Sequence, residues 1–194
     1  MYGWGLIKGM GVTLKHFVNS YVDDMRYLFR GGRYRQQYVV ERQAHKATGI
    51  FTVQYPDERL PLPENFRYIP FLVVDEATGK ERCTGCGICS KVCPPQCIWI
   101  VRAKDPQTGR PKSESAQFVI DTTICMNCGL CAEFCPFDAI KMDHDYEVAG
   151  YDRFDALVFA KDKLNKTDTY HYSIHPSAKE IEEQSKKKDK AKSE

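Results

Sequence analysis

The 194 residues include 28 Lys and Arg against 26 Asp and Glu, which gives a formal net charge of +2. A charge this close to zero provides no overall field that would mark the chain as a nucleic-acid-binding protein. The length allows one domain with appendages or two small domains. No run of about 18 apolar residues occurs, so no membrane-spanning helix is expected.

Residues 1–50 are predicted to form a helical arm with a basic insertion. Apolar residues recur at helical spacing over residues 1–30, which predicts an amphipathic helix, and Gly31 and Gly32 follow as its stop signal. The apolar stripe consists of Leu6, Met10, Leu14, Phe17 or Val18, Tyr21, Met25 and Leu28. Residues 33–50 are basic and polar and predict no clear element. The arm has eight basic residues against three acidic ones, a composition suited to anionic lipid or a partner protein.

The rest of the chain divides by composition. Four prolines predict an extended connection over residues 51–74. Residues 75–148 contain all the cysteines and are predicted to form the folded domain. Residues 149–177 read as an irregular C-terminal extension with a helix near residues 151–163. Residues 178–194 are almost all Lys, Glu, Ser and Asp, which predicts a disordered tail.

The nine cysteines lie between Cys83 and Cys135, within an internal repeat. Each copy reads C-x2-C-x2-C-x3-C-P, and the second copy begins 42 residues after the first. Each copy predicts a loop, a short helix and a strand. The sequence therefore predicts an α+β fold of the bacterial-type 2[4Fe-4S] ferredoxin-like class, with a pseudo-two-fold internal repeat.

The motif spacing predicts two [4Fe–4S] clusters with crossed ligands. Three cysteines two residues apart wrap one face of a cluster, and the fourth ligates the other cluster. The first cluster is expected on Cys83, Cys86, Cys89 and Cys135. The second cluster is expected on Cys125, Cys128, Cys131 and Cys93. Gly87 and Gly129 lack a Cβ, so backbone N–H groups can approach cluster sulfur there.

Other interpretations of the cysteines fit less well. Structural zinc sites use pairs of cysteines separated by a spacer rather than two triplets that each lead to a Cys-Pro. A disulfide framework is disfavoured because the count is odd, the spacing is every third residue and no secretory leader is visible. The ninth cysteine, Cys97, aligns with Ala139, so we interpret it as a small packing residue rather than a ligand or redox thiol.

No residues suited to substrate chemistry are recognised, so no catalytic residue is expected. The five histidines show no ligand spacing with acids or cysteines and are interpreted as surface or packing residues. No phosphate loop, Ser–His–Asp set or flavin fingerprint is present. A protein that holds clusters without a catalytic site moves electrons and needs redox partners.

The flanks of the cysteine motifs are more specific than the motifs. From Gly9 to Leu164 the chain resembles the two-cluster ferredoxin-like iron–sulfur subunit of respiratory complex I, subunit I of NADH:quinone oxidoreductase. The resemblance rests on GMGVTLKHF, FTVQYPDERLPLPENFR, the two motifs and MDHDYEVAGYDRFDALVFAKDKL. Residues 19–50 depart from the pattern as an apparent insertion, and the Lys-rich tail lies outside it.

The resemblance implies a non-catalytic electron-transfer subunit of a respiratory-chain translocase, with the eight assigned cysteines as ligands. It implies partners in a multi-subunit membrane redox complex, among them the quinone-site iron–sulfur subunit and membrane-arm subunits, with the membrane surface beside the arm. It places the chain peripherally on the cytoplasmic face of the inner (plasma) membrane. The alternative is the iron–sulfur subunit of a membrane-bound hydrogenase or ferredoxin-driven complex. A metal-stabilised nucleic-acid module is a further class, and no nucleic-acid partner is expected.

Overall fold

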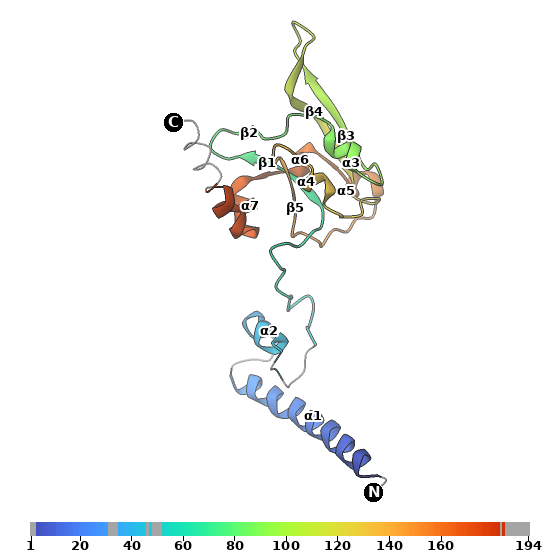
Figure 1. The fold of residues 1–194 in the computed structure, drawn as a ribbon, viewed down its shortest axis with the longest axis vertical. Coiled ribbons are helices and arrows are strands. Elements are labelled where there is room, and N and C mark those ends of the chain that lie inside the picture. Colours follow the sequence, from blue (N-terminus) through green and yellow to red (C-terminus); the bar gives the residue numbers. More distant parts are fainter. Residues whose placement is uncertain (1–2, 31–34, 46, 48–51, 183, 185–194) are drawn as a thin grey trace. The chain divides into compact units, whose positions relative to one another are not determined.

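The computed structural model describes residues 3–30, 35–45, 47, 52–182 and 184. The chain divides into two compact units, Met1–Leu62 and Pro63–Glu194. Figure 1 shows the helices and strands of both units and colours them along the sequence. None of the helices in the described part of the chain combines the length and apolar character needed to cross a bilayer.

The first unit contains two helices, α1 at Trp4–Phe29 and α2 at Gln36–Gln43. With 26 residues, α1 is about 39 Å long. It lies within the range predicted for a helix over residues 1–30. None of its residues, all of which are described, is buried. The apolar stripe of α1 is therefore exposed over its full length.

The segment predicted as basic and unassigned contains α2, which anchors the chain that follows it. Arg42 of α2 is buried and forms an ion pair with the fully buried Glu58. The Gln36 side chain accepts a hydrogen bond from the Arg59 backbone N–H at 2.9 Å and donates one to its carbonyl at 2.6 Å. These contacts fix part of the predicted proline-rich connection against α2.

The second unit contains two small sheets. The first sheet has the order β2-β1-β5, with β7 pairing in parallel with β1. The second sheet is antiparallel and has the order β3-β4-β6. The strands of the first sheet are β1 (Pro70–Asp75), β2 (Lys80–Glu81), β5 (Ile140–Met142) and β7 (Asn165–Thr167). Those of the second are β3 (Ile98–Lys104), β4 (Pro111–Asp121) and β6 (Val158–Ala160).

Five short helices accompany these sheets. They are α3 (Ile88–Val92), α4 (Leu130–Glu133), α5 (Arg153–Leu157), α6 (Lys161–Leu164) and α7 (Asp168–Ile174). The buried core joins residues of both sheets to five of the cysteines. It comprises Leu72, Cys83, Cys89, Cys93, Cys97, Ile98, Phe118, Ile120, Cys131, Ala139, Ile140 and Leu164. These five cysteines are therefore packed inside the hydrophobic core.

The folded domain starts earlier than the sequence predicts. Residues up to 74 were expected to be an extended connection, yet β1 is the strand to which β2, β5 and β7 all pair. Its residues Phe71, Leu72 and Val73 are almost fully buried. Pro70 does not prevent this strand because it is the strand's first residue, a position where proline is tolerated.

The C-terminal extension is more regular than predicted. The single helix expected near residues 151–163 is instead α5, β6 and α6. β-Branched and aromatic residues favour a strand at Val158 and Phe159, and β6 pairs with β4 through Val119 opposite Ala160. Because β7 joins the first sheet through parallel pairing with β1, the extension contributes one strand to each sheet.

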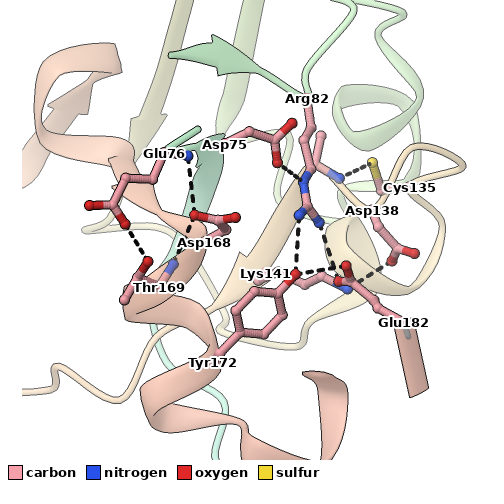
Figure 2. Close-up of polar contacts among 11 residues, drawn as sticks. Asp75, Glu76, Arg82, Cys135, Asp138, Lys141, Asp168, Thr169, Tyr172 and Glu182 are labelled. Carbon is pink, nitrogen blue, oxygen red and sulfur yellow. Dashed lines mark hydrogen bonds and ion pairs between the residues drawn. The ribbon is translucent and has the colours of Figure 1, made fainter. Parts of the chain in front are cut away.

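Part of the tail also differs from the predicted disorder. Residues 176–182 are helical, and Glu182 contacts two groups of the domain (Figure 2). It accepts hydrogen bonds from Arg82 at 3.2 Å and from the Tyr172 hydroxyl at 2.8 Å. Arg82 also donates to Asp75 at 2.8 Å, so this ion-pair network orders the start of the tail. The remainder of the predicted tail, residue 183 and residues 185–194, lies outside the described residues.

Candidate metal centres

The two cysteine loops have matching backbone conformations. Gly87 and Gly129 both have φ of 80° and immediately precede α3 and α4. Gly85 and Asn127, at equivalent positions of the repeat, have φ of 65° and 51°. Gln96 and Asp138 form a third equivalent pair, at 52° and 50°. This third pair could not be predicted from glycine placement because neither residue is a glycine, although Asp is among the residues that tolerate this region.

A first cavity of about 330 Å³ is lined by Cys83, Cys86, Cys89 and Cys135. Three of these come from the loop before α3 and from α3 itself, and the fourth follows α4. Apolar residues of both sheets close the cavity, namely Leu72, Ile100, Phe118 and Ile140. The Ala139 backbone N–H points toward the Cys135 sulfur at 3.4 Å, as an N–H donor to a thiolate would.

A second cavity of about 320 Å³ is lined by Cys93, Cys125, Cys128 and Cys131. Here three cysteines belong to the second motif and one belongs to the first. The cavity also contains Cys97 and Met126. The structure thus brings the eight predicted residues together in the two crossed groups of four.

The chemistry of the cavities fits a cationic group that binds thiolates. Burial raises the pKa of Cys89 and Cys131 to about 12, and it also raises the pKa of Cys83. Buried thiolates without a positive partner are unfavourable, whereas a metal stabilises them and releases their protons. Two orphaned polar atoms, Thr84 Oγ1 and Asn127 Oδ1, lie buried beside the cysteines without a hydrogen-bond partner among the described residues.

The size of the group is indicated by the spacing of the ligands. Among the residues that the structure describes, no three His, Cys, Asp or Glu side chains converge in the way that one metal ion requires. Each cavity is nevertheless lined by four cysteines. A polynuclear cluster separates its ligands more widely than a single zinc ion does, so the arrangement suits iron–sulfur clusters.

Arg67 supports the second loop and was not recognised from the sequence. It donates to the Cys128 carbonyl at 2.8 Å and pairs with Glu133 of α4 at 2.6 Å. A Cβ at Gly129 would lie 3.0 Å from the Arg67 Nη1 atom, so glycine makes room for this contact. No sequence pattern links Arg67 to a loop 61 residues later, which is why only the fold reveals its role.

Cys97 is packed beside the second cavity, as the alignment with Ala139 suggests. Both residues are almost fully buried, at 1% and 2% exposure. The Cys97 sulfur lies 3.4 Å from that of Cys93, and burial raises the pKa of the Cys97 thiol above its usual range. The thiol therefore contacts a candidate ligand, a polar contact that the packing interpretation did not include.

Among the described residues, neither cysteine cavity is lined by a histidine. His171 is 2% exposed, and its ring centroid is 4.9 Å from that of His175, which in turn is 5.0 Å from that of His144. Burial lowers the pKa of His171 to about 4, so this imidazole is neutral and packs in the domain. His16 and His45 are exposed in the first unit.

Comparison with known proteins agrees with this geometry. Residues 82–145 match the model of the 4Fe-4S dicluster domain. A "NADH-quinone oxidoreductase subunit I 2" of Geobacter metallireducens is 39% identical over 113 residues, which are 58% of this chain and 82% of that protein. A "NADH-quinone oxidoreductase subunit I 1" of Syntrophobacter fumaroxidans is 31% identical over 156 residues, 80% of this chain and 84% of that protein.

The extent of the match varies among relatives. A "NADH-quinone oxidoreductase subunit I 2" of Symbiobacterium thermophilum is 38% identical over 97 residues, but the chain spans only 40% of its length. The matches to the Geobacter and Syntrophobacter proteins cover more than four fifths of each relative. With the dicluster domain and its two four-cysteine cavities, this shows that the chain belongs to the subunit I family of NADH-quinone oxidoreductases, whose members hold two [4Fe–4S] clusters.

Proposed function

We propose that the chain relays single electrons through two [4Fe–4S] clusters in the peripheral arm of a complex I-type NADH:quinone oxidoreductase. The observation that carries the proposal is the pair of cavities, each lined by four cysteines drawn from both motifs. Two such centres inside one small core suit a protein that passes electrons from one partner to another rather than one that uses them on a substrate of its own. The names of the relatives favour this reading over a hydrogenase or ferredoxin-driven complex.

The proposed ligands follow the two groups of four. The first cluster is assigned to Cys83, Cys86, Cys89 and Cys135, and the second to Cys125, Cys128, Cys131 and Cys93. Their crowding in each cavity supports this assignment. The matching φ angles of the two loops further support a pseudo-two-fold repeat in which each copy supplies three ligands to one cluster and one to the other.

The chain's own residues would bind the clusters, shield them and hold them at a fixed separation. Each cluster, when bound, supplies one-electron redox chemistry at a potential set by its surroundings. Leu72 and Phe118, which line the first cavity, exclude water from it, and the buried residues Ile98 and Met142 do so for the second. Cys97 and Cys131 lie in the same buried cluster of residues as Cys83 and Cys89, so the two centres share one low-dielectric interior.

The helical arm is the proposed attachment to membrane-arm subunits and the membrane surface. Large apolar side chains of α1 are widely exposed, among them Leu6 at 72%, Met10 at 65% and Leu28 at 64%. Lys8 and Lys15 accompany them on the same helix. An exposed apolar stripe with basic residues suits a protein groove bordered by anionic lipid. In this proposal the chain is peripheral, on the cytoplasmic face of the inner membrane.

The test is to purify the complex through a tag on this chain and to follow its clusters by EPR. NADH added anaerobically is expected to reduce the clusters and to produce their EPR signals. The signal that depends on Cys128 should be absent in a Cys128→Ala variant, and added quinone is expected to reoxidise the clusters. Signals that respond to hydrogen or reduced ferredoxin but never to NADH would favour the related complexes instead. Protease digestion of inverted and right-side-out vesicles checks the membrane face.

A further inference from the structure

Two positions of the repeat carry different chemistry in its two copies. Thr84 of the first copy corresponds to Met126 of the second, and Cys97 corresponds to Ala139. Thr84 and Ala139 line the first cavity, whereas Met126 and Cys97 line the second. Each cavity thus receives one side-chain donor and one apolar side chain, but from opposite ends of the motif.

The Thr84 hydroxyl is buried. Its Oγ1 atom has no hydrogen-bond partner among the described residues, which is an unfavourable state for a polar group. The hydroxyl hydrogen can rotate toward any acceptor. Cys83, Cys86 and Cys89 line the same cavity, but none of their sulfurs is a hydrogen-bond partner of this hydroxyl among the described residues, so the acceptor left for it is sulfur of the bound cluster.

The Cys97 thiol has a comparable place in the second cavity. It is 1% exposed, and its sulfur lies 3.4 Å from the sulfur of Cys93, a proposed ligand of that cluster. Cys93 as a ligand is a thiolate and can only accept a hydrogen bond, so the shared proton belongs to Cys97. A thiol is a weaker donor than a hydroxyl, so its effect should be the smaller one.

Hydrogen bonds to cluster sulfur favour the reduced form, which carries one more negative charge. We propose that Thr84 and Cys97 are potential-setting residues, one for each cluster: the Thr84 hydroxyl raises the reduction potential of the first cluster, and the Cys97 thiol raises that of the second. The inference rests on the proposed function, since it requires both clusters to be present. It assigns the difference between the clusters to two side chains that are not ligands.

The experiment is a redox titration of the full chain followed by EPR. Thr84→Val keeps the shape of the side chain and removes the hydroxyl. This variant is expected to have a lower reduction potential at the first cluster. At a fixed applied potential, the reduced-to-oxidised ratio of that cluster should fall about three- to tenfold, where tenfold corresponds to about 59 mV for one electron. Cys97→Ala is expected to lower the potential of the second cluster by less. In each variant the other cluster should keep its potential.

Matched variants separate tuning from a structural effect. Thr84→Ser restores a hydroxyl and should return the first cluster to its original potential. Thr108→Val removes a hydroxyl from the exposed turn between β3 and β4, where it contacts Asp105, and should change neither potential. A Cys86→Ser ligand variant identifies the signal of the first cluster.

Two results would overturn the inference. One is an unchanged potential for both clusters in Thr84→Val and Cys97→Ala, with iron at about eight atoms per chain. The other is an equal shift of both clusters in either variant. A wild-type chain without two cluster signals would overturn the proposed function as well, so the two failures are distinguishable.

Discussion

At the scale of single residues, substitution of Cys93 tests whether the two clusters have crossed ligands. Cys93 belongs to the first motif but lines the cavity of the second, together with Cys125, Cys128 and Cys131. Cys93→Ala is therefore expected to damage the second cluster and to leave the signal of the first. Site-resolved EPR and iron content are the measurements. Cys97→Ala is the matched control, because it should retain about eight irons per chain. Loss of only the first cluster in Cys93→Ala would falsify the crossing.

Gly85 illustrates how a backbone turn and a close approach combine. Its φ is 65°, and an added Cβ would lie 3.1 Å from the Glu114 carbonyl oxygen. Gly109 has nearly the same φ, 66°, with nothing within 4 Å of its Cβ position. Gly109→Ala should cost about 1–2 kcal/mol from backbone strain alone, whereas Gly85→Ala should cost more and reduce occupancy of the first cluster. Unfolding curves and iron content compare the two, and equal losses would remove the steric argument.

His171 predicts a pH dependence of folding. Its pKa falls from an ordinary value of 6.5 to about 4 in the fold because burial disfavours the charged ring. The unfolded state therefore binds more protons between these values, and stability is lost as pH falls from about 6.5 toward 4. The full effect, reached below both pKa values, is roughly 3–4 kcal/mol. His171→Phe should weaken the dependence measured by denaturation at pH 7 and pH 5. An identical slope in both proteins would contradict this assignment.

At the scale of elements, the sequence predicted the cysteine loops better than the strands around them. The loops were predictable because ligand spacing and glycine placement act locally, as at Gly87 and Gly129. The strands β1, β6 and β7 were missed because pairing depends on residues far apart in the chain. β1, for example, pairs Leu72 with both Ile140 and Asn165. Short runs such as Val158–Ala160 carry too little periodicity to be told from a helix.

The arm gives a prediction at the same scale. α1 exposes apolar side chains along its length, and none of its residues is buried. Deletion of residues 1–30 is expected to leave both clusters intact, because every cysteine lies in the second unit. It should release the protein from membranes and from its complex. Co-sedimentation and pull-down compare the truncated and full chains, and a truncated chain that still binds both in full yield would contradict the proposal.

At the scale of the whole second unit, cluster binding and folding are expected to be one process. The buried core includes Cys83, Cys89, Cys93, Cys97 and Cys131, so removing the clusters leaves voids in the middle of that core. The crossed ligation would also tie each motif to the other through Cys93 and Cys135. A domain this small has little other buried apolar surface to compensate for such a loss.

Iron chelation is therefore expected to unfold the second unit cooperatively. Visible absorbance from the clusters and far-UV circular dichroism from β1, β3 and β4 should fall together along one transition, because metal binding and folding are linked. α1 and α2 belong to the other unit and should lose no signal, so a chain lacking residues 1–30 provides the control. If the dichroism of the second unit persists after iron and absorbance are lost, the apolar core stabilises the fold by itself, and the clusters are not required for folding.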